Sequence, residues 1–365
     1  MADLAEKPES QEDLLRYLRE ALLARLPSSW QVDLVPEPGY GRLRPDATVH
    51  LVGPDGTDRT LLVETKSTIN ARDVPAMLMQ LAEMQSATPL EALGPPIVIS
   101  RYMAPRTREM LADAGASYVD ATGNVRIVVD RPALYLEGLG AKSDPWRGPE
   151  RETRTLRGKP AARVVRGLVD FREPLGIREL ADRSGASIGS TYRTIAFLEK
   201  EALLTRGEKG RVVSVNWQEL LLRWSEDYSF QTSNKILAAL EPRGMEKILT
   251  KLRQLKGEVR YAVTGALSAN RVSQVAPPRL ATILTPEVQR LYDALQLRDA
   301  AGAPNVLLAR PFDDTLLARS EVTDGITYAA FSQTAADLLT SPGRGPVEAE
   351  ALLSWMTANE EAWRG

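Results

Sequence analysis

The chain has 365 residues, of which 43% are hydrophobic and 26% charged, and its formal net charge is -2. This length allows two or three domains of ordinary globular composition. With no cysteine and one histidine, the sequence excludes disulfides, thiolate sites and multi-histidine zinc sites, so a metal would be magnesium or manganese on carboxylates. No signal-peptide pattern and no membrane-length apolar run is present, so we expect a cytoplasmic protein without a membrane partner.

The first 140 residues predict a mixed α/β sheet. Their apolar periodicity indicates helices over 10–26, 74–86 and from Pro105 to the residue before Gly115. The expected strands are 31–35, 47–52, 61–65, 97–99, 117–119, 125–129 and 134–136. We assign residues 1–140 to one domain and 141–158, which are rich in glycine, proline and charge, to a linker.

Two acids and a lysine fall on neighbouring strands of this domain. Asp46 precedes one strand, and Glu64 and Lys66 share a face of the next, so all three can meet in one patch. The set resembles the PD-(D/E)XK nucleases. That resemblance implies a restriction-endonuclease-like domain in which Asp46 and Glu64 hold Mg²⁺ or Mn²⁺ and Lys66 polarises an attacking water. Weaker candidates for auxiliary positions are Glu20 and Gln80. The alternative is a solvated ion pair on a catalytically silent scaffold.

Residues 159–229 predict a winged helix-turn-helix. Helical patterns at 164–171, 177–184 and 187–200 precede two apparent strands around a cationic tip, the wing, at 206–211. On the third helix, an apolar stripe is expected from Ile188, Thr191, Ile195 and Leu198. The opposite face should read base edges in a major groove, and the tip should contact phosphates. The expected DNA-binding residues are Ser187, Ser190, Tyr192, Arg193, Thr194, Arg206, Lys209 and Arg211.

The local charge supports a nucleic-acid partner. Residues 150–211 contain 14 Lys and Arg against 9 Asp and Glu, an excess of positive charge in a chain that is slightly negative overall. The alternative is a winged helix used only for protein contact or dimerisation. Because operators are commonly read by two-fold dimers, we expect a homodimer on double-stranded DNA.

The last third continues with expected helices at 217–228, 235–240 and 245–255, a strand passing through glycine into a helix at 261–269, and a strand at 305–311. Nucleotide transfer would require a phosphate-binding turn followed closely by paired acids. Thr264-Gly265 has no such acids nearby, and Asp313-Asp314 comes far downstream. We therefore expect residues 230–365 to hold a partner or to mediate self-association.

Several segments, in order along the chain, resemble AbiEi-type proteins, the antitoxin and transcriptional-regulator component of type IV toxin-antitoxin systems. They are residues 100–105, 115–126 with the Asp120 to Asn124 motif, 261–269, 305–311, 324–328, 333–339 and 342–350. The resemblance implies a multidomain α+β protein with a nuclease-like domain, a winged helix and a nucleotidyltransferase-like domain over 230–365. It also implies a nucleotidyltransferase-type toxin as a partner.

The sequence therefore predicts a sequence-specific DNA-binding transcriptional regulator that needs no cofactor to bind DNA. Two alternatives stay open. One is a Mg²⁺-dependent DNase delivered to its substrate by the winged helix. The other is an antitoxin that acts mainly on a protein toxin.

Overall fold

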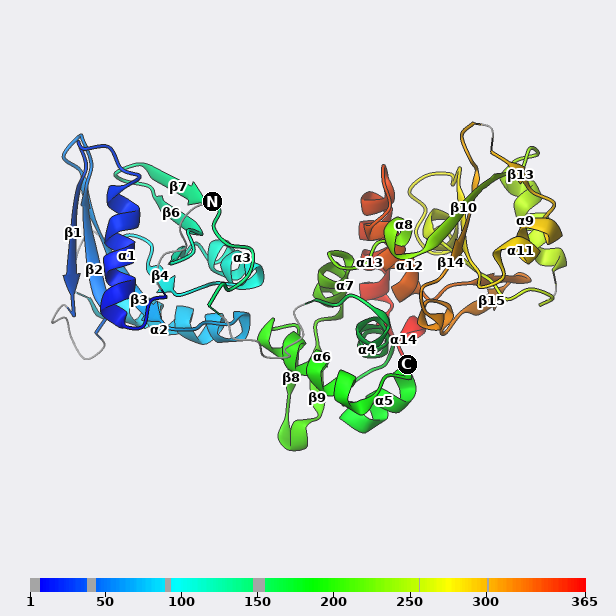
Figure 1. The fold of residues 1–365 in the computed structure, drawn as a ribbon, viewed down its shortest axis with the longest axis horizontal. Helices are drawn as coiled ribbons and strands as arrows, with labels where there is room; N and C mark the ends of the chain where they lie inside the picture. The colour runs from blue at the N-terminus through cyan, green and yellow to red at the C-terminus, as the bar shows by residue number, and fades with distance from the viewer. Residues whose placement is uncertain (1–6, 38–43, 89–92, 147–154, 256, 301) are drawn as a thin grey trace. The chain divides into compact units, whose positions relative to one another are not determined.

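The structure is a computed structural model that describes residues 7–37, 44–88, 93–146, 155–255, 257–300 and 302–365. The chain divides into two compact units (Figure 1). The first is Met1–Arg151 with Lys200–Ala202, and the second is Glu152–Glu199 with Leu203–Gly365. Over the described residues the fold is mixed α+β, with two seven-stranded sheets and one two-stranded sheet. Within the described ranges, no helix has the length and apolar character needed to span a membrane.

The first unit is built on a sheet whose strands lie in sequence order from β1 to β7. An antiparallel meander is formed by β1 (Gln31–Pro36), β2 (Ala47–Val52) and β3 (Asp58–Lys66). Next, β4 (Ile97–Ser100) pairs parallel to β3, and β5 (Ser117–Asp120) pairs parallel to β4. The sheet ends with the antiparallel strands β6 (Val125–Val129) and β7 (Leu134–Gly138).

Helices cover both faces of this sheet. Alternation along β3 sends Leu61 and Val63 into the core that α1 (Gln11–Leu23) shares, and Leu62 into the core on the opposite face. That opposite face is covered by α2 (Val74–Ala87), which follows a short 3-10 turn η1 (Ala71–Asp73), and by α3 (Pro105–Asp113). The unit is therefore a three-layer α/β/α arrangement, and the mixed α/β sheet predicted for the first 140 residues is confirmed.

The second unit opens with three helices, α4 (Lys159–Asp170), α5 (Ile177–Ser184) and α6 (Ile188–Lys200). A hairpin follows, formed by β8 (Leu204–Arg206), a 3-10 turn η2 (Glu208–Gly210) and β9 (Val212–Val215). Leu175, between α4 and α5, makes an antiparallel bridge with Val212 of β9. Helices α7 (Trp217–Ser225) and α8 (Phe230–Ser233) then lead to the second large sheet. The predicted order of helices and hairpin is confirmed.

The second sheet has the order β13-β10-β14-β12-β11-β16-β15. Its strands are β10 (Lys235–Leu240), β11 (Ala262–Thr264), β12 (Ala281–Leu284), β13 (Arg298–Asp299), β14 (Val306–Arg310), β15 (Glu321–Thr323) and β16 (Ile326–Tyr328). The helices of this region are α9 (Met245–Gln254), α10 (Gly265–Ala269), α11 (Val288–Ala294), η3 (Asp314–Leu317), α12 (Phe331–Leu339), α13 (Gly345–Ala358) and α14 (Glu360–Trp363). One apolar core contains α9 and α11, while another joins α12 and α13 to α4 and α7.

The helix predicted at 235–240 is wrong, because these residues form strand β10. Leucine, alanine and lysine favour helices in isolation, but six residues before Pro242 make a short segment in which helix formation is weak. In the fold this segment pairs antiparallel with β14 over Lys235–Ala239, so partners about seventy residues away determine its conformation.

Candidate functional site

Helix α6 begins after a turn of three residues that follows α5. Gly185 has φ 68° and ψ 19°, a left-handed conformation that glycine adopts without a steric penalty. Ser187 then accepts a hydrogen bond of 3.2 Å at its Oγ from the backbone N–H of Ser190, which satisfies one orphan amide of the helix. The turn therefore fixes the direction in which α6 leaves α5.

One face of α6 is buried and the other is exposed. The buried side chains are Thr191, Thr194, Ile195 and Leu198. The exposed residues are Ser187, Ile188, Gly189, Tyr192 and Arg193, with Ser190 half-buried beside them. Helix α6 thus presents short polar groups and one long cation on the side away from the core.

Two of the expected placements on α6 are wrong. Thr194, expected on the free face, is only 3% exposed because the helical period puts it between Thr191 and Leu198 on the buried side. Ile188, expected in the core, is 55% exposed because it is the first helical residue and the apolar stripe there extends past the core. Compared with the prediction, the exposed face of α6 therefore lacks the Thr194 hydroxyl and includes the branched apolar side chain of Ile188.

Arg193 is held toward the beginning of α6. Its Nη2 donates a hydrogen bond of 3.3 Å to Ser190 Oγ, and Ser190 also receives a hydrogen bond of 2.9 Å from the Ser187 hydroxyl. A Cβ on Gly189 would lie 3.5 Å from Arg193 Nη1, so the guanidinium extends over the glycine. The donors of Arg193 are thus gathered on the first exposed turn of the helix.

The hairpin carries a cation at its tip. Lys209 has φ 59°, is exposed, and has no ion-pair or hydrogen-bond partner among the residues that the structure describes. Arg211, also exposed, donates a hydrogen bond of 3.0 Å to the carbonyl of Pro174. The bridge between Leu175 and Val212 anchors the strand just behind the tip. The hairpin therefore projects Lys209 from a base that is fixed at the segment joining α4 to α5.

Arg206 joins the hairpin to α6. Its Nη2 makes an ion pair with Glu199, and its guanidinium lies over the ring of Tyr192, 6.0 Å from the centroid. The hydrogen bond to Glu199 raises the pKa of the Arg206 guanidinium. Because its charge is already paired, Arg206 is better suited to holding Tyr192 and the hairpin together than to neutralising a phosphate.

In the first unit, the structure brings Glu64 and Lys66 together. Lys66 Nζ lies 2.5 Å from Glu64 Oε1, and both side chains project from the end of β3. Asp46, just before β2, accepts hydrogen bonds of 2.7 Å at Oδ2 from the backbone N–H and the hydroxyl of Thr65. Glu64 is only 4% exposed, whereas the Lys66 side chain is 39% exposed, so the ion pair joins a buried carboxylate to a partly exposed ammonium group.

The surroundings of Glu64 raise the pKa of its carboxyl group. Burial raises the pKa of the Glu64 carboxyl, and the charge of Asp46 acts in the same direction, while the hydrogen bond from Lys66 opposes both. One oxygen of each carboxylate, Asp46 Oδ1 and Glu64 Oε2, has no hydrogen bond among the described residues. Mg²⁺ is commonly held by one or two carboxylates with water and phosphate, so Asp46 and Glu64 offer the type of ligand that a divalent ion uses. No group of three or more acidic or histidine ligands occurs within the described ranges.

The two auxiliary candidates lie in different layers. Glu20 is exposed on α1, which packs against the sheet face opposite to that of Glu64. Gln80 is half-buried on α2, the helix that covers the face on which Glu64 and Lys66 lie. The sheet therefore separates Glu20 from Glu64, whereas Gln80 lies on the same side of the sheet as Glu64.

The Asp120 to Asn124 motif forms a tight turn between β5 and β6, as predicted. Asp120 is fully buried and accepts hydrogen bonds from the backbone N–H groups of Met103, Thr122 and Asn124. The Asn124 amide donates to Asp120 over 2.8 Å, and its Oδ1 accepts from the N–H of Gly140 over 2.9 Å. This motif therefore ties three loops of the first unit together, and its polar groups are used internally.

The strand-to-helix turn at Thr264-Gly265 is also occupied by internal bonds. Thr264 is fully buried, and its hydroxyl donates a hydrogen bond of 2.6 Å to Asp337.

Asp313 is also bonded within the protein. It accepts hydrogen bonds of 3.0 and 2.9 Å from two guanidinium nitrogens of Arg163, and the third nitrogen of Arg163 donates a hydrogen bond of 2.7 Å to the carbonyl of Gly185. Asp313 thereby helps to hold the turn between α5 and α6.

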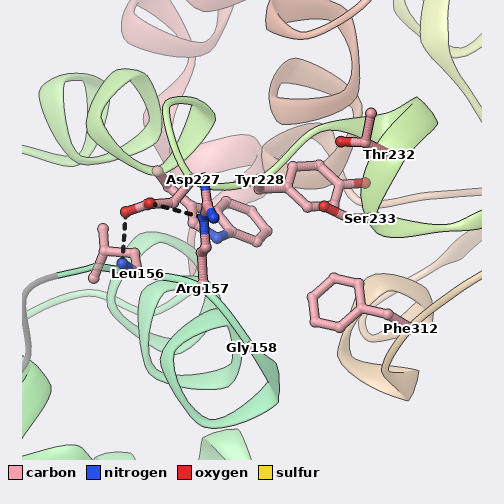
Figure 2. Close-up of a pocket in the computed structure, with 9 residues that line it drawn as sticks. Leu156, Arg157, Gly158, Asp227, Tyr228, Thr232, Ser233 and Phe312 are labelled. Carbon is pink, nitrogen blue, oxygen red and sulfur yellow. Dashed lines mark hydrogen bonds and ion pairs between the residues drawn. The ribbon is translucent and has the colours of Figure 1, made fainter.

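A cavity of about 380 Å³ lies beside the start of α4 (Figure 2). Asp227 accepts a hydrogen bond of 2.6 Å from the backbone N–H of Leu156 and forms an ion pair with Arg157. The rings of Trp224 and Tyr228 stack with centroids 4.7 Å apart. The cavity is lined by Leu156, Arg157, Gly158, Trp224, Asp227, Tyr228, Thr232, Ser233 and Phe312. Its charged groups pair with each other, so they hold the chain that enters α4.

No protein-family model, curated protein or solved structure matches the chain.

Proposed function

We propose that this protein is a sequence-specific DNA-binding transcriptional regulator that inserts α6 into the major groove. The observation that carries the proposal is the two-sided character of α6: Thr191, Ile195 and Leu198 face the core, while Ser187 and Arg193 are exposed. A major groove admits one α-helix and offers donors and acceptors on every base pair. The residues at the start of such a helix contact the base edges.

The elements around α6 support a winged helix-turn-helix. Three residues separate α5 from α6, and the β8–β9 hairpin is tied to α6 through Arg206 and to the α4–α5 segment through Leu175. A helix and a hairpin held in this way can contact a groove and the adjacent phosphates together. In this arrangement Arg193 reads bases, and Lys209 contacts the backbone.

The wider proposal is a regulator of the AbiEi antitoxin type that acts as a homodimer on double-stranded DNA. The order of the motif segments supports it, as does the turn formed by Asp120 and Asn124. The proposal includes a nuclease-like first domain, a nucleotidyltransferase-like last domain and a nucleotidyltransferase-type toxin as a partner. The alternative is an antitoxin that acts mainly on such a toxin. This alternative predicts that the protein prefers no specific DNA duplex.

The test is selection of a duplex from a random library by the full-length protein, followed by affinity measurement at several salt concentrations. We expect the selected duplex to bind at least a hundred-fold more tightly than a scrambled one, because specific sites typically exceed non-specific DNA by about 10³ or more. Equal affinity for the two duplexes would contradict the proposal.

A second candidate function is a metal-dependent DNase centred on Glu64. The observation that favours it is the pair of Glu64 and Lys66, in which Glu64 is buried, with Asp46 just before the adjacent strand. Two carboxylates that share one divalent ion can orient a phosphate and activate a water. The two candidate functions predict opposite outcomes in a cleavage assay.

A further inference from the structure

Ile188 and Tyr192 form a small apolar ridge on the exposed face of α6. Their side chains are 55% and 54% exposed, and residues four apart are neighbours on a helix surface. Single exposed apolar residues are ordinary. Here two exposed apolar side chains lie next to the hydrogen-bond donors of Arg193 and Ser187. The start of α6 therefore presents both apolar and hydrogen-bonding groups.

Both side chains of the ridge are restrained before any ligand binds. The Tyr192 ring is covered by the Arg206 guanidinium, which Glu199 holds by an ion pair. Ile188 is β-branched, so its χ1 is largely fixed in a helix. A restrained side chain loses little rotamer entropy when it is buried, so the ridge is suited to a contact of defined geometry.

Resting on the DNA-binding function proposed above, we infer that Ile188, supported by Tyr192, reads the C5-methyl group of a pyrimidine in the major groove. Among the four natural bases, only thymine offers a methyl group on this edge, and apolar side chains contact it. Ile188 is the first residue of α6, where base contacts are made. Cytosine methylated at C5 presents the same group at the same place, so it is a second source of this ligand chemistry.

The surroundings of the ridge favour DNA over a protein partner. Its neighbours Ser187, Gly189 and Ser190 are small, so a base edge can approach the backbone of α6 closely. The local excess of positive charge across 150–211 also fits a polyanion. A stable protein interface buries about 800 Å² on each partner, far more than two side chains provide.

The experiment uses the full-length protein and the duplex that it selects from a random library. Each thymine of the selected site is replaced in turn by deoxyuridine, which removes only the C5-methyl group, and affinity is measured by fluorescence anisotropy. At one or two positions we expect the affinity to fall about four-fold, the effect of losing one buried carbon at about 0.8 kcal/mol. In a further duplex, 5-methylcytosine paired with guanine replaces that thymine. Retained affinity shows that the methyl group suffices, whereas lost affinity assigns recognition to thymine as a whole.

Ile188→Ala should bind the thymine and deoxyuridine duplexes equally, and its melting temperature should match the wild type because the side chain is exposed. Val322→Ala is the matched control, since Val322 is an apolar residue on β15 that is 70% exposed. If deoxyuridine has no effect at any position of a specifically bound duplex, or its effect persists in Ile188→Ala, the inference is overturned while DNA binding stands. If no duplex is preferred over a scrambled one, the proposed function fails as well.

Discussion

Arg166 Nη1 donates a hydrogen bond of 2.9 Å to the side-chain oxygen of Gln333, which lies 167 residues further along the chain. Both side chains are buried, and Arg166 also donates 2.8 Å to Asp170 and 3.0 Å to the carbonyl of Thr315. The Ser332 hydroxyl completes the set by donating to Asp170. Helices α4 and α12 thus share one buried polar network, so the three-helix segment and the second sheet belong to one structural unit.

We expect Arg166→Met to lower the free energy of unfolding of the second unit by about 3 to 5 kcal/mol, because Asp170 would remain buried without its cation. Urea denaturation, followed by tryptophan fluorescence and by circular dichroism, measures this loss. Arg178→Met is the control, since Arg178 is exposed and has no partner among the described residues. A loss below about 1 kcal/mol in Arg166→Met would show that the network contributes little.

Asp337 gives this unit a pH-dependent stability. Burial raises the pKa of its carboxyl to about 6, although hydrogen bonds from Thr264, Tyr228 and Gln333 lower it. In the unfolded chain the group returns to its ordinary value of 3.8. Between these values the folded protein binds more protons, so stability from this group is fully present below pH 4 and is lost as the pH rises through 6.

The expected contribution is roughly 3 kcal/mol between pH 4 and pH 7. Asp337→Asn keeps the shape and removes the titration, so the wild type should lose stability relative to this variant over that range. Urea unfolding at half-unit pH steps gives the difference directly. Parallel curves for the two proteins would show that Asp337 does not titrate in this range.

The sequence predicted most elements of the first unit because each is determined locally. Its strands alternate, Pro105 and Gly115 mark the limits of α3, and the turn at Gly123 requires a positive φ, which is 101° in the fold. Strand β10 shows where this approach fails. Its residues favour helix, and their strand partners lie on β14, which no local pattern reveals.

The candidate site was predictable in part. Charge and helical period indicated the exposed face of α6, but the limits of its buried stripe depend on where the core ends. Ile188 was therefore predicted to be buried and is exposed, and Thr194 was predicted to be exposed and is buried. The pairing of Arg163 with Asp313 spans 150 residues and has no sequence pattern. For Arg166 and Asp170 a signal existed, because two opposite charges four residues apart occur within an otherwise apolar helical run.

Two cations of the candidate interface should have different effects on DNA binding. Arg193→Ala is expected to reduce discrimination between the selected and scrambled duplexes by about 1 to 3 kcal/mol, because its bidentate donors would read a base. Lys209→Ala should weaken binding to all duplexes and lower the salt slope by about one unit. Anisotropy titrations over a range of salt concentrations separate the two effects, with Lys235→Ala, an exposed cation on β10, as the control.

Assembly is expected to follow the symmetry of the operator. A dimer doubles the contacts at half-sites about one helical turn apart or a multiple of it, so we predict a homodimer on DNA. Light scattering coupled to size exclusion measures the mass of the free protein and of its complex with the selected duplex. A single copy on DNA, together with a selected sequence that lacks two-fold symmetry, would contradict this expectation.

The acidic pair of the first unit separates the two proposed functions. A regulator must leave its site intact, so we expect supercoiled, linear and single-stranded DNA to remain uncut in magnesium and in manganese. A nuclease would need both carboxylates on the metal, so Asp46→Ala and Glu64→Gln should each abolish its activity. Cleavage by the wild type that disappears in both variants, while Asp33→Ala on β1 still cuts, would establish the DNase instead.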